Sequence, residues 1–164
     1  MTAWTSSVGS HKGYVYESSD VLAISVMDTA THETFAGISG IAAASVPTSG
    51  VASYAGGYSG TFVRTGVGDA RNANGSFTTS VDFGNGTVIG SGTGTDFSSL
   101  SITGTVSGTQ FNGTATYAST DYSGVATAPL TGGFYGTNTM AGVYQNTDVS
   151  GVIWGTNPLI QHGR

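Results

Sequence analysis

The 164-residue chain contains no cysteine and very few charged residues. The absence of cysteine excludes disulfide bonds, zinc–thiolate sites and thiol catalysis. Charged residues make up 8% of the chain, against a usual share of about 25%. Four basic residues stand against nine acidic ones, which gives a net charge of −5. This balance repels nucleic-acid phosphates and anionic membrane surfaces, so we expect neither as a partner.

Long apolar runs and the common catalytic motifs are also missing. No apolar run is long enough to span a membrane, and the start MTAWTSSVGSHKGY lacks the basic and apolar regions of a signal peptide. We expect no membrane insertion of this domain. The chain has no Gly-x-Ser-x-Gly elbow, phosphate loop or dinucleotide fingerprint, and its carboxylates are scattered. These absences predict that the chain is not an enzyme.

The chain is instead rich in glycine and in aromatic residues. It holds 27 Gly, 8 Tyr, 7 Phe and 2 Trp, and 38% of its residues are hydrophobic. Disordered chains combine high net charge with few aromatic residues, so this composition predicts a folded chain with a core. A length of 164 residues suits one domain, because domains usually contain about 100–200 residues.

Period-2 alternation predicts strands and hairpins. Phe77, Val81 and Phe83 share one face of residues 76–83, and Gly84-Asn85-Gly86 supplies a tight turn before the β pattern resumes at residues 87–89. A second hairpin joins residues 100–106 to 111–117 through a turn at residues 107–108. Further strands are predicted at residues 20–28, 50–63, 132–136, 139–146 and 149–155. No segment has a convincing helical period.

Large and small side chains alternate along one face of residues 50–63. Tyr54, Tyr58 and Phe62 are separated there by glycines, a pattern that fills the interior of a small closed barrel. We interpret Tyr54 and Tyr58 as core residues rather than as the lining of a ligand cavity. The predicted fold is all-β: a single glycine-rich antiparallel eight-stranded β-barrel over residues 47–164, with a small N-terminal β extension over residues 1–46 that packs on the barrel.

Two segments without apolar alternation, residues 65–75 and 118–129, are predicted as long loops. Loops on a rigid scaffold usually carry binding residues. We therefore expect the ligand-binding residues in and beside the first loop, at Arg64, Asp69, Arg71 and Asn72.

Histidines and asparagines give weaker signals. His11, His32 and His162 lie far apart without metal-ligand spacing, so no metal or cofactor is predicted. If the fold brought two of these histidines together at a barrel end, they would be possible haem ligands. Asn74, Asn85 and Asn112 each begin an Asn-Gly-Ser/Thr sequence; we interpret these as Asn-Gly turns rather than as glycosylation sites.

Four segments in order resemble the β-barrel domain of transferrin-binding protein B-like surface lipoproteins. They are PTSGVASYAGGYSG (47–60), FTTSVDFGNGTVIGSG (77–92), SITGTVSGTQFNGTAT (101–116), and LTGGFYGTNTMAGVY with SGVIWGTN (130–157). The resemblance implies an eight-stranded barrel without catalysis that binds host proteins or an iron or haem source. It also implies a location on the extracellular face of the bacterial outer membrane, or secretion, if a leader is removed. The family's lipid-bearing cysteine and its larger handle domain are absent from this chain, which weakens specific transferrin binding.

Two functions fit these observations. The first is a non-catalytic surface binding module for a host or environmental macromolecule, or for a haem or iron source. The alternative is a structural or adhesive component, such as a virion or cell-surface spike, that uses the barrel as a rigid scaffold. The low charge and abundant Ser, Thr and Gly fit both.

Overall fold

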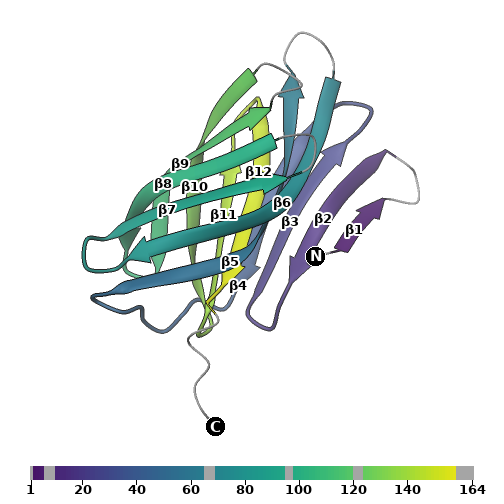
Figure 1. The fold of residues 1–164 in the computed structure, drawn as a ribbon. Coiled ribbons are helices and arrows are strands. Elements are labelled where there is room, and N and C mark those ends of the chain that lie inside the picture. The colour runs from purple at the N-terminus through teal and green to yellow at the C-terminus, as the bar shows by residue number, and fades with distance from the viewer. Residues whose placement is uncertain (1, 6–9, 65–68, 95–97, 120–123, 158–164) are drawn as a thin grey trace.

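The structure, a computed structural model, describes residues 2–5, 10–64, 69–94, 98–119 and 124–157. Within these ranges the chain forms an N-terminal sheet beside a closed barrel (Figure 1). The sheet is antiparallel, in the order β1 (Thr2–Thr5), β2 (His11–Glu17), β3 (Val21–Asp28) and β4 (Thr34–Gly40). The described ranges contain no helix that is long and apolar enough to cross a membrane.

The barrel closes through eight antiparallel strands, each paired with its neighbours in the sequence, and β12 pairs back with β5. This confirms the predicted all-β fold with an eight-stranded antiparallel barrel. The strands are β5 (Val51–Arg64), β6 (Asp69–Asp82), β7 (Thr87–Gly94), β8 (Ser98–Ser107), β9 (Gln110–Ser119), β10 (Gly124–Tyr135), β11 (Thr139–Gln145) and β12 (Val149–Thr156).

The predicted loop over residues 118–129 is wrong for residues 118–119 and 124–129, which lie on strands, and residues 120–123 lie outside the described residues. Strand β9 continues to Ser119 and β10 begins at Gly124, and the two pair from Ser119 with Gly124 to Gln110 with Gly133. The predicted strand over residues 132–136 is therefore only the last part of β10. The sequence pattern led to a loop prediction because the residues of β10 that face the interior at this end are Ala126 and Ala128. Alanine is too small to give a clear apolar alternation.

The barrel interior is filled by aromatic side chains that lie against glycines. Phe111 is fully buried, and a Cβ atom on Gly132 or Gly142 would meet its ring. Phe77 takes the same position over Gly90, where its Cζ would stand 2.8 Å from an added Cβ. Glycine thus makes room for rings inside a barrel of limited width. Tyr54 and Tyr58 belong to this core, so their interpretation as core residues is confirmed.

Hydroxyl side chains cover the outer wall of the barrel. Because side chains alternate between the two faces of a strand, the residues between the buried ones point outward, and they pair in rows across neighbouring strands. One such row reads Thr78, Ser91, Ser101, Thr116, Thr127. These neutral polar residues keep the wall solvated without charge, which accounts for the abundant Ser and Thr.

The N-terminal sheet packs on the barrel through an apolar interface. Val21 and Ala23 of β3 are buried against Val152 and Trp154 of β12. The rings of Tyr16 and Trp154 stack with centroids 5.1 Å apart and planes inclined by 16°. These contacts fix the sheet on the barrel wall, so the surface that it presents outward is held in place.

One buried hydroxyl in the barrel core is unsatisfied. Tyr144 is fully buried, and its hydroxyl has no hydrogen-bond partner among the described residues. Burial raises the pKa of this phenol far above its ordinary value. Tyr58, in contrast, shares a hydrogen bond of 3.0 Å between its hydroxyl and Ser98 Oγ. The two tyrosines therefore form a matched pair for a stability test.

Replacing Tyr144 with phenylalanine is expected to raise the free energy of unfolding by about 1 kcal/mol, because the penalty of burying an unpaired hydroxyl disappears. Tyr58→Phe is expected to lower it by about 1 kcal/mol through loss of a hydrogen bond. Urea unfolding at neutral pH measures both. Above about pH 10 the unfolded chain loses the phenol proton while folded Tyr144 keeps it, so the wild type loses stability and the advantage of Tyr144→Phe grows. A destabilising Tyr144→Phe would show that this hydroxyl is hydrogen-bonded in solution.

Candidate functional site

An open cleft of about 590 Å³ lies where the turn between β3 and β4 meets one end of the barrel. On the sheet side it is lined by His11, Asp28, His32 and Phe35, among others, and on the barrel side by Val63 of β5 and the turn that follows β11. The cleft forms here because the sheet extends along the barrel wall to this end and its turn stands over the last residues of β11.

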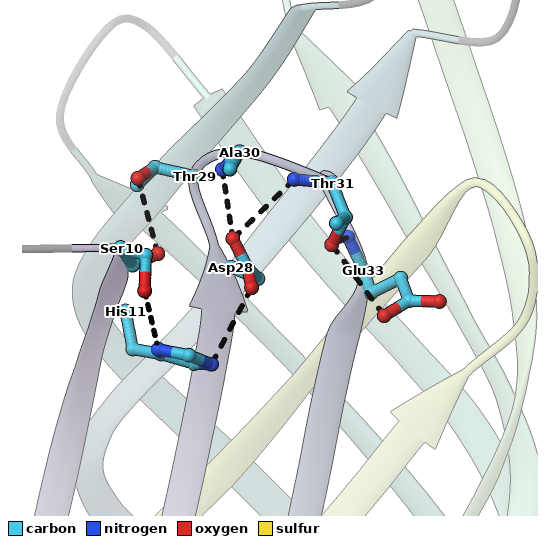
Figure 2. Close-up of polar contacts among 7 residues, drawn as sticks. All are labelled: Ser10, His11, Asp28, Thr29, Ala30, Thr31 and Glu33. Atoms are coloured by element: carbon cyan, nitrogen blue, oxygen red, sulfur yellow. Dashed lines mark hydrogen bonds and ion pairs between the residues drawn. The ribbon is translucent and has the colours of Figure 1, made fainter. Parts of the chain in front are cut away.

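Asp28 organises the turn that forms the rim of the cleft. Figure 2 shows its carboxylate facing the backbone of the turn on one side and His11 on the other. Oδ1 accepts the N–H groups of Ala30 and Thr31 at 2.7 and 3.3 Å. Oδ2 lies 3.5 Å from His11 Nε2. The pKa of Asp28 is lowered, mainly by the hydrogen bond from Ala30, so the rim carries a fixed negative charge at neutral pH.

The Ser10, His11 and Asp28 side chains are connected in series, as in a catalytic triad, but their geometry differs. Ser10 Oγ is 2.9 Å from Nδ1 of His11, and Asp28 approaches Nε2, so the two ring nitrogens have exchanged the roles that they have in the triad. The distance to Asp28 exceeds hydrogen-bond reach, and the side chain of His11 is 47% exposed. We assign these contacts to the stability of the turn rather than to catalysis.

The cleft continues onto an apolar stripe on the outer face of the sheet. Leu22, Ile24 and Val26 of β3 alternate with buried residues and therefore point away from the barrel. The register places Val15 beside Ile24, and Phe35 beside Val26. Phe35 and Leu22 are 56% and 41% exposed. The apolar stripe is defined by these five residues: Val15, Leu22, Ile24, Val26, Phe35.

Carboxylates lie at both ends of the apolar stripe. Glu17 pairs with Leu22 at one end, whereas Asp28 and Glu33 lie at the cleft end. Strand alternation places Lys12 on the opposite face of β2. Among the strand positions that face outward with the stripe on β2, β3 and β4, no lysine or arginine occurs. The stripe is thus apolar along its length and acidic at its ends.

The structure places the predicted loop residues on strands. Arg64 ends β5 and Asp69 begins β6, and the two pair across the hairpin, so the predicted loop over residues 65–75 is wrong for residues 69–75. Residues 65–68 lie outside the described residues. Arg71 pairs with Phe62, and the amide oxygen of Asn72 accepts a 2.7 Å hydrogen bond from Thr61 Oγ1. Ligand binding by these four residues stays a prediction.

The structure brings two of the three candidate histidines together. His11 and His32 both line the cleft, which lies beside the N-terminal sheet, and His162 lies outside the described residues. No group of three or more potential metal ligands occurs in the part of the chain that the structure describes. The role of these histidines as haem ligands stays a prediction.

Sequence reasoning missed Asp28, Glu33 and Phe35. A signal was present, because VLAISVMD (21–28) is apolar on both faces. A half-buried strand needs only one apolar face, so the second face indicated either further burial or a binding surface.

Residues 46–157 match the family model described as the C-lobe and N-lobe beta barrels of Tf-binding protein B. The chain belongs to this family. The matched segment covers the whole barrel but not the N-terminal sheet, which carries most of the cleft and all of the apolar stripe. No curated protein sequence matches the chain.

Solved structures share the fold at low sequence identity. A mutant of the vaccine antigen transferrin-binding protein B from Haemophilus parasuis Hp5 has 13% identity and a TM-score of 0.68, over 94% of this chain and 36% of that one. A mutant of the same antigen from Actinobacillus pleuropneumoniae H49 has 17% identity and a TM-score of 0.66, over 88% and 80%. A protein described as a surface lipoprotein has 17% identity and a TM-score of 0.65, over 88% and 80%. These matches cover more of the chain than residues 46–157, so the shared fold includes at least part of the N-terminal region.

Proposed function

We propose that this chain is a non-catalytic binding module, displayed on the outer surface of a bacterial cell, that takes a protein partner on the apolar stripe. Membership of the transferrin-binding protein B barrel family supports a binding role. The structural relatives named as transferrin-binding protein B and as a surface lipoprotein support the surface location and a protein as the partner.

The observation that carries this proposal is the contiguous exposure of Phe35 and its neighbours on a rigid sheet. Single exposed apolar residues are normal on soluble proteins, whereas a contiguous apolar patch edged by polar groups marks an interaction site. The Cε1–Cζ edge of the Phe35 ring lies beside Gly37, with both atoms 3.1 Å from where a Cβ would stand. The ring is thus 56% exposed at a position without a competing side chain, and exposed aromatic residues are the anchors that dominate protein interfaces.

The charges around the stripe support a partner with a basic rim. Glu17, Asp28 and Glu33 would meet lysine or arginine side chains placed around an apolar centre on the partner. Such complementarity mainly accelerates association and selects among partners. The proposal therefore includes a salt dependence: affinity should fall as ionic strength rises, because salt screens exposed charges.

Serum transferrin, in its iron-loaded and iron-free forms, is the probe for this surface. Phe35→Ser is expected to weaken binding by about 30-fold or more, the effect of losing a central anchor of about 2 kcal/mol. Ile89→Ser is the matched control, because Ile89 is 60% exposed on β7, on the barrel wall rather than on the sheet. Surface plasmon resonance measures both variants at two salt concentrations.

Three results would contradict the proposal. They are no binding of either form of transferrin, equal losses for Phe35→Ser and Ile89→Ser, and an affinity that does not depend on salt. A trimer or larger assembly of the chain alone in light scattering would favour the structural scaffold instead. The unfolding midpoint of each variant checks that a lost signal is not a lost fold.

A further inference from the structure

Three Asn-Gly pairs in the chain differ in what the fold does to them. They are Asn74-Gly75, Asn85-Gly86 and Asn112-Gly113. In such a pair the backbone nitrogen of the glycine is able to attack the side-chain amide of the asparagine, because glycine has no Cβ to hinder the approach. The reaction also needs a backbone that bends to bring the two groups together. Only one of the three pairs lies in a turn, and the other two lie inside strands.

Two of the pairs lie inside strands that are hydrogen-bonded on both sides. Gly75 of β6 is paired with Tyr58 and Gly94, and Gly113 of β9 with Gly104 and Leu130. The interpretation of Asn74-Gly75 and Asn112-Gly113 as turns is therefore wrong, since the ladders run through both. An extended backbone held on both sides keeps the glycine nitrogen and the asparagine side chain apart.

The third pair lies in the exposed turn between β6 and β7, as predicted. Asn85 is exposed, and Gly86 has a φ of +63°, which favours glycine. Asp82 accepts hydrogen bonds from both the backbone N–H and Nδ2 of Asn85, at 3.0 and 2.8 Å. The Gly86 carbonyl accepts the N–H of Val106 at 2.9 Å. The Gly86 N–H makes no hydrogen bond within the described residues, so no hydrogen bond has to break before this nitrogen attacks.

We propose that Asn85 is a site of spontaneous deamidation, and that the fold protects Asn74 and Asn112. The Gly86 nitrogen gives up its proton to solvent and bonds to Asn85 Cγ. The Cγ–Nδ2 bond then breaks as the departing NH2 group takes a proton from solvent and leaves as ammonia. Water then opens the resulting five-membered succinimide at either carbonyl, which gives aspartate or isoaspartate. The net change is the exchange of an amide for a carboxylate, with water consumed and ammonia released.

The modification changes the charge and the length of a turn that fixes strand register. A carboxylate at position 85 replaces the amide that donates to Asp82, and two like charges then face each other across the turn. Isoaspartate also adds a methylene to the backbone between Asp82 and Thr87, the last pair of the β6–β7 ladder. Turn geometry sets hairpin register, so this end of the barrel loses stability as the protein ages.

Peptide mapping by mass spectrometry tests the proposal on the full chain, incubated at mildly alkaline pH in the folded state and in urea. In the folded protein Asn85 is expected to convert at least about tenfold faster than Asn74 or Asn112, which corresponds to about 1.4 kcal/mol of activation free energy. In urea the three sites should convert at similar rates. Isoaspartate methyltransferase labelling of the same samples should locate the isoaspartate at position 85 and fail with Asn85→Gln. Equal rates at the three sites in the folded protein, or an inert folded Asn85 that reacts in urea, would overturn the proposal.

Discussion

Trp154→Ala is expected to lower the free energy of unfolding by about 4 kcal/mol, which is the usual cost of truncating a buried tryptophan. Trp154 is 7% exposed, stacks on Tyr16 of the N-terminal sheet, and lies over Gly57 on the neighbouring strand. Its truncation opens a cavity between sheet and barrel. For a chain of this size the melting temperature should fall by about 8–16 °C. Calorimetry measures this loss, and hydrogen exchange should show reduced protection in β2 and β3 before β7 and β8.

Two controls separate the interface from a general loss of packing. Tyr16→Phe keeps the stacked ring and is expected to change stability by less than about 0.5 kcal/mol. Val125→Ala changes an apolar residue of β10 that is 70% exposed, and it should be equally mild. If Trp154→Ala cost less than about 1 kcal/mol, the stacking interface would not be what holds the sheet on the barrel. A loss of protection that is uniform over both sheets would lead to the same conclusion.

The barrel could be predicted from the sequence because its signals are local. Phe77, Val81 and Phe83 alternate over a few residues, and Gly84-Asn85-Gly86 directly supplies the turn that reverses the chain. Each hairpin then pairs with the next in order, which is the simplest topology for an antiparallel sheet. The alternation of aromatic residues with glycine along β5 supported closure, because rings in a narrow interior need small partners.

The start of β6 could not be predicted, because its interior positions are small. Ala73 and Gly75 face inward there, and residues 69–75 include Asp, Arg and Asn, which resemble a loop. The strand exists because β5 offers a complete ladder, from Val51 paired with Asp82 to Arg64 paired with Asp69. Pairing with a neighbouring strand overrides the weak preference of each residue. A local pattern does not contain that information.

The cleft could not be predicted, because it is formed by contacts between strands that local sequence patterns do not encode. His11 lies opposite Asp28 because of the register between β2 and β3, and His32 follows in the next turn with a φ of +60°, which is unusual for histidine. The sequence indicated both histidines as possible ligands, but no sequence pattern predicted that they lie close to Phe35 or to the barrel. The apolar stripe was more accessible to prediction, because both faces of β3 are apolar in the sequence itself.

Gly132→Ala is expected to lower the free energy of unfolding by about 3 kcal/mol, at the upper end of the range for overpacked cores. A Cβ at this position would collide with the ring of Phe111 and with the carbonyl oxygen of Ala141. The ring is able to turn, but the carbonyl belongs to β11 and is fixed by its pairing with β10 and β12. The strain must therefore be taken up by the barrel wall. Urea unfolding of the purified variant measures the loss.

Gly142→Ala is the matched control, because it faces the same ring from the neighbouring strand. Its Cβ would stand 3.1 Å from Phe111 Cζ and 3.2 Å from atoms of Ile153 and Leu130, all of them in side chains. Side chains adjust by a few tenths of an ångström, so a loss of less than about 1 kcal/mol is expected. Combining Gly132→Ala with Phe111→Leu relieves the ring contact but leaves the carbonyl collision. If the double variant recovered full wild-type stability, the ring alone would be the obstacle, and glycine at position 132 would serve side-chain packing rather than the approach of two backbones.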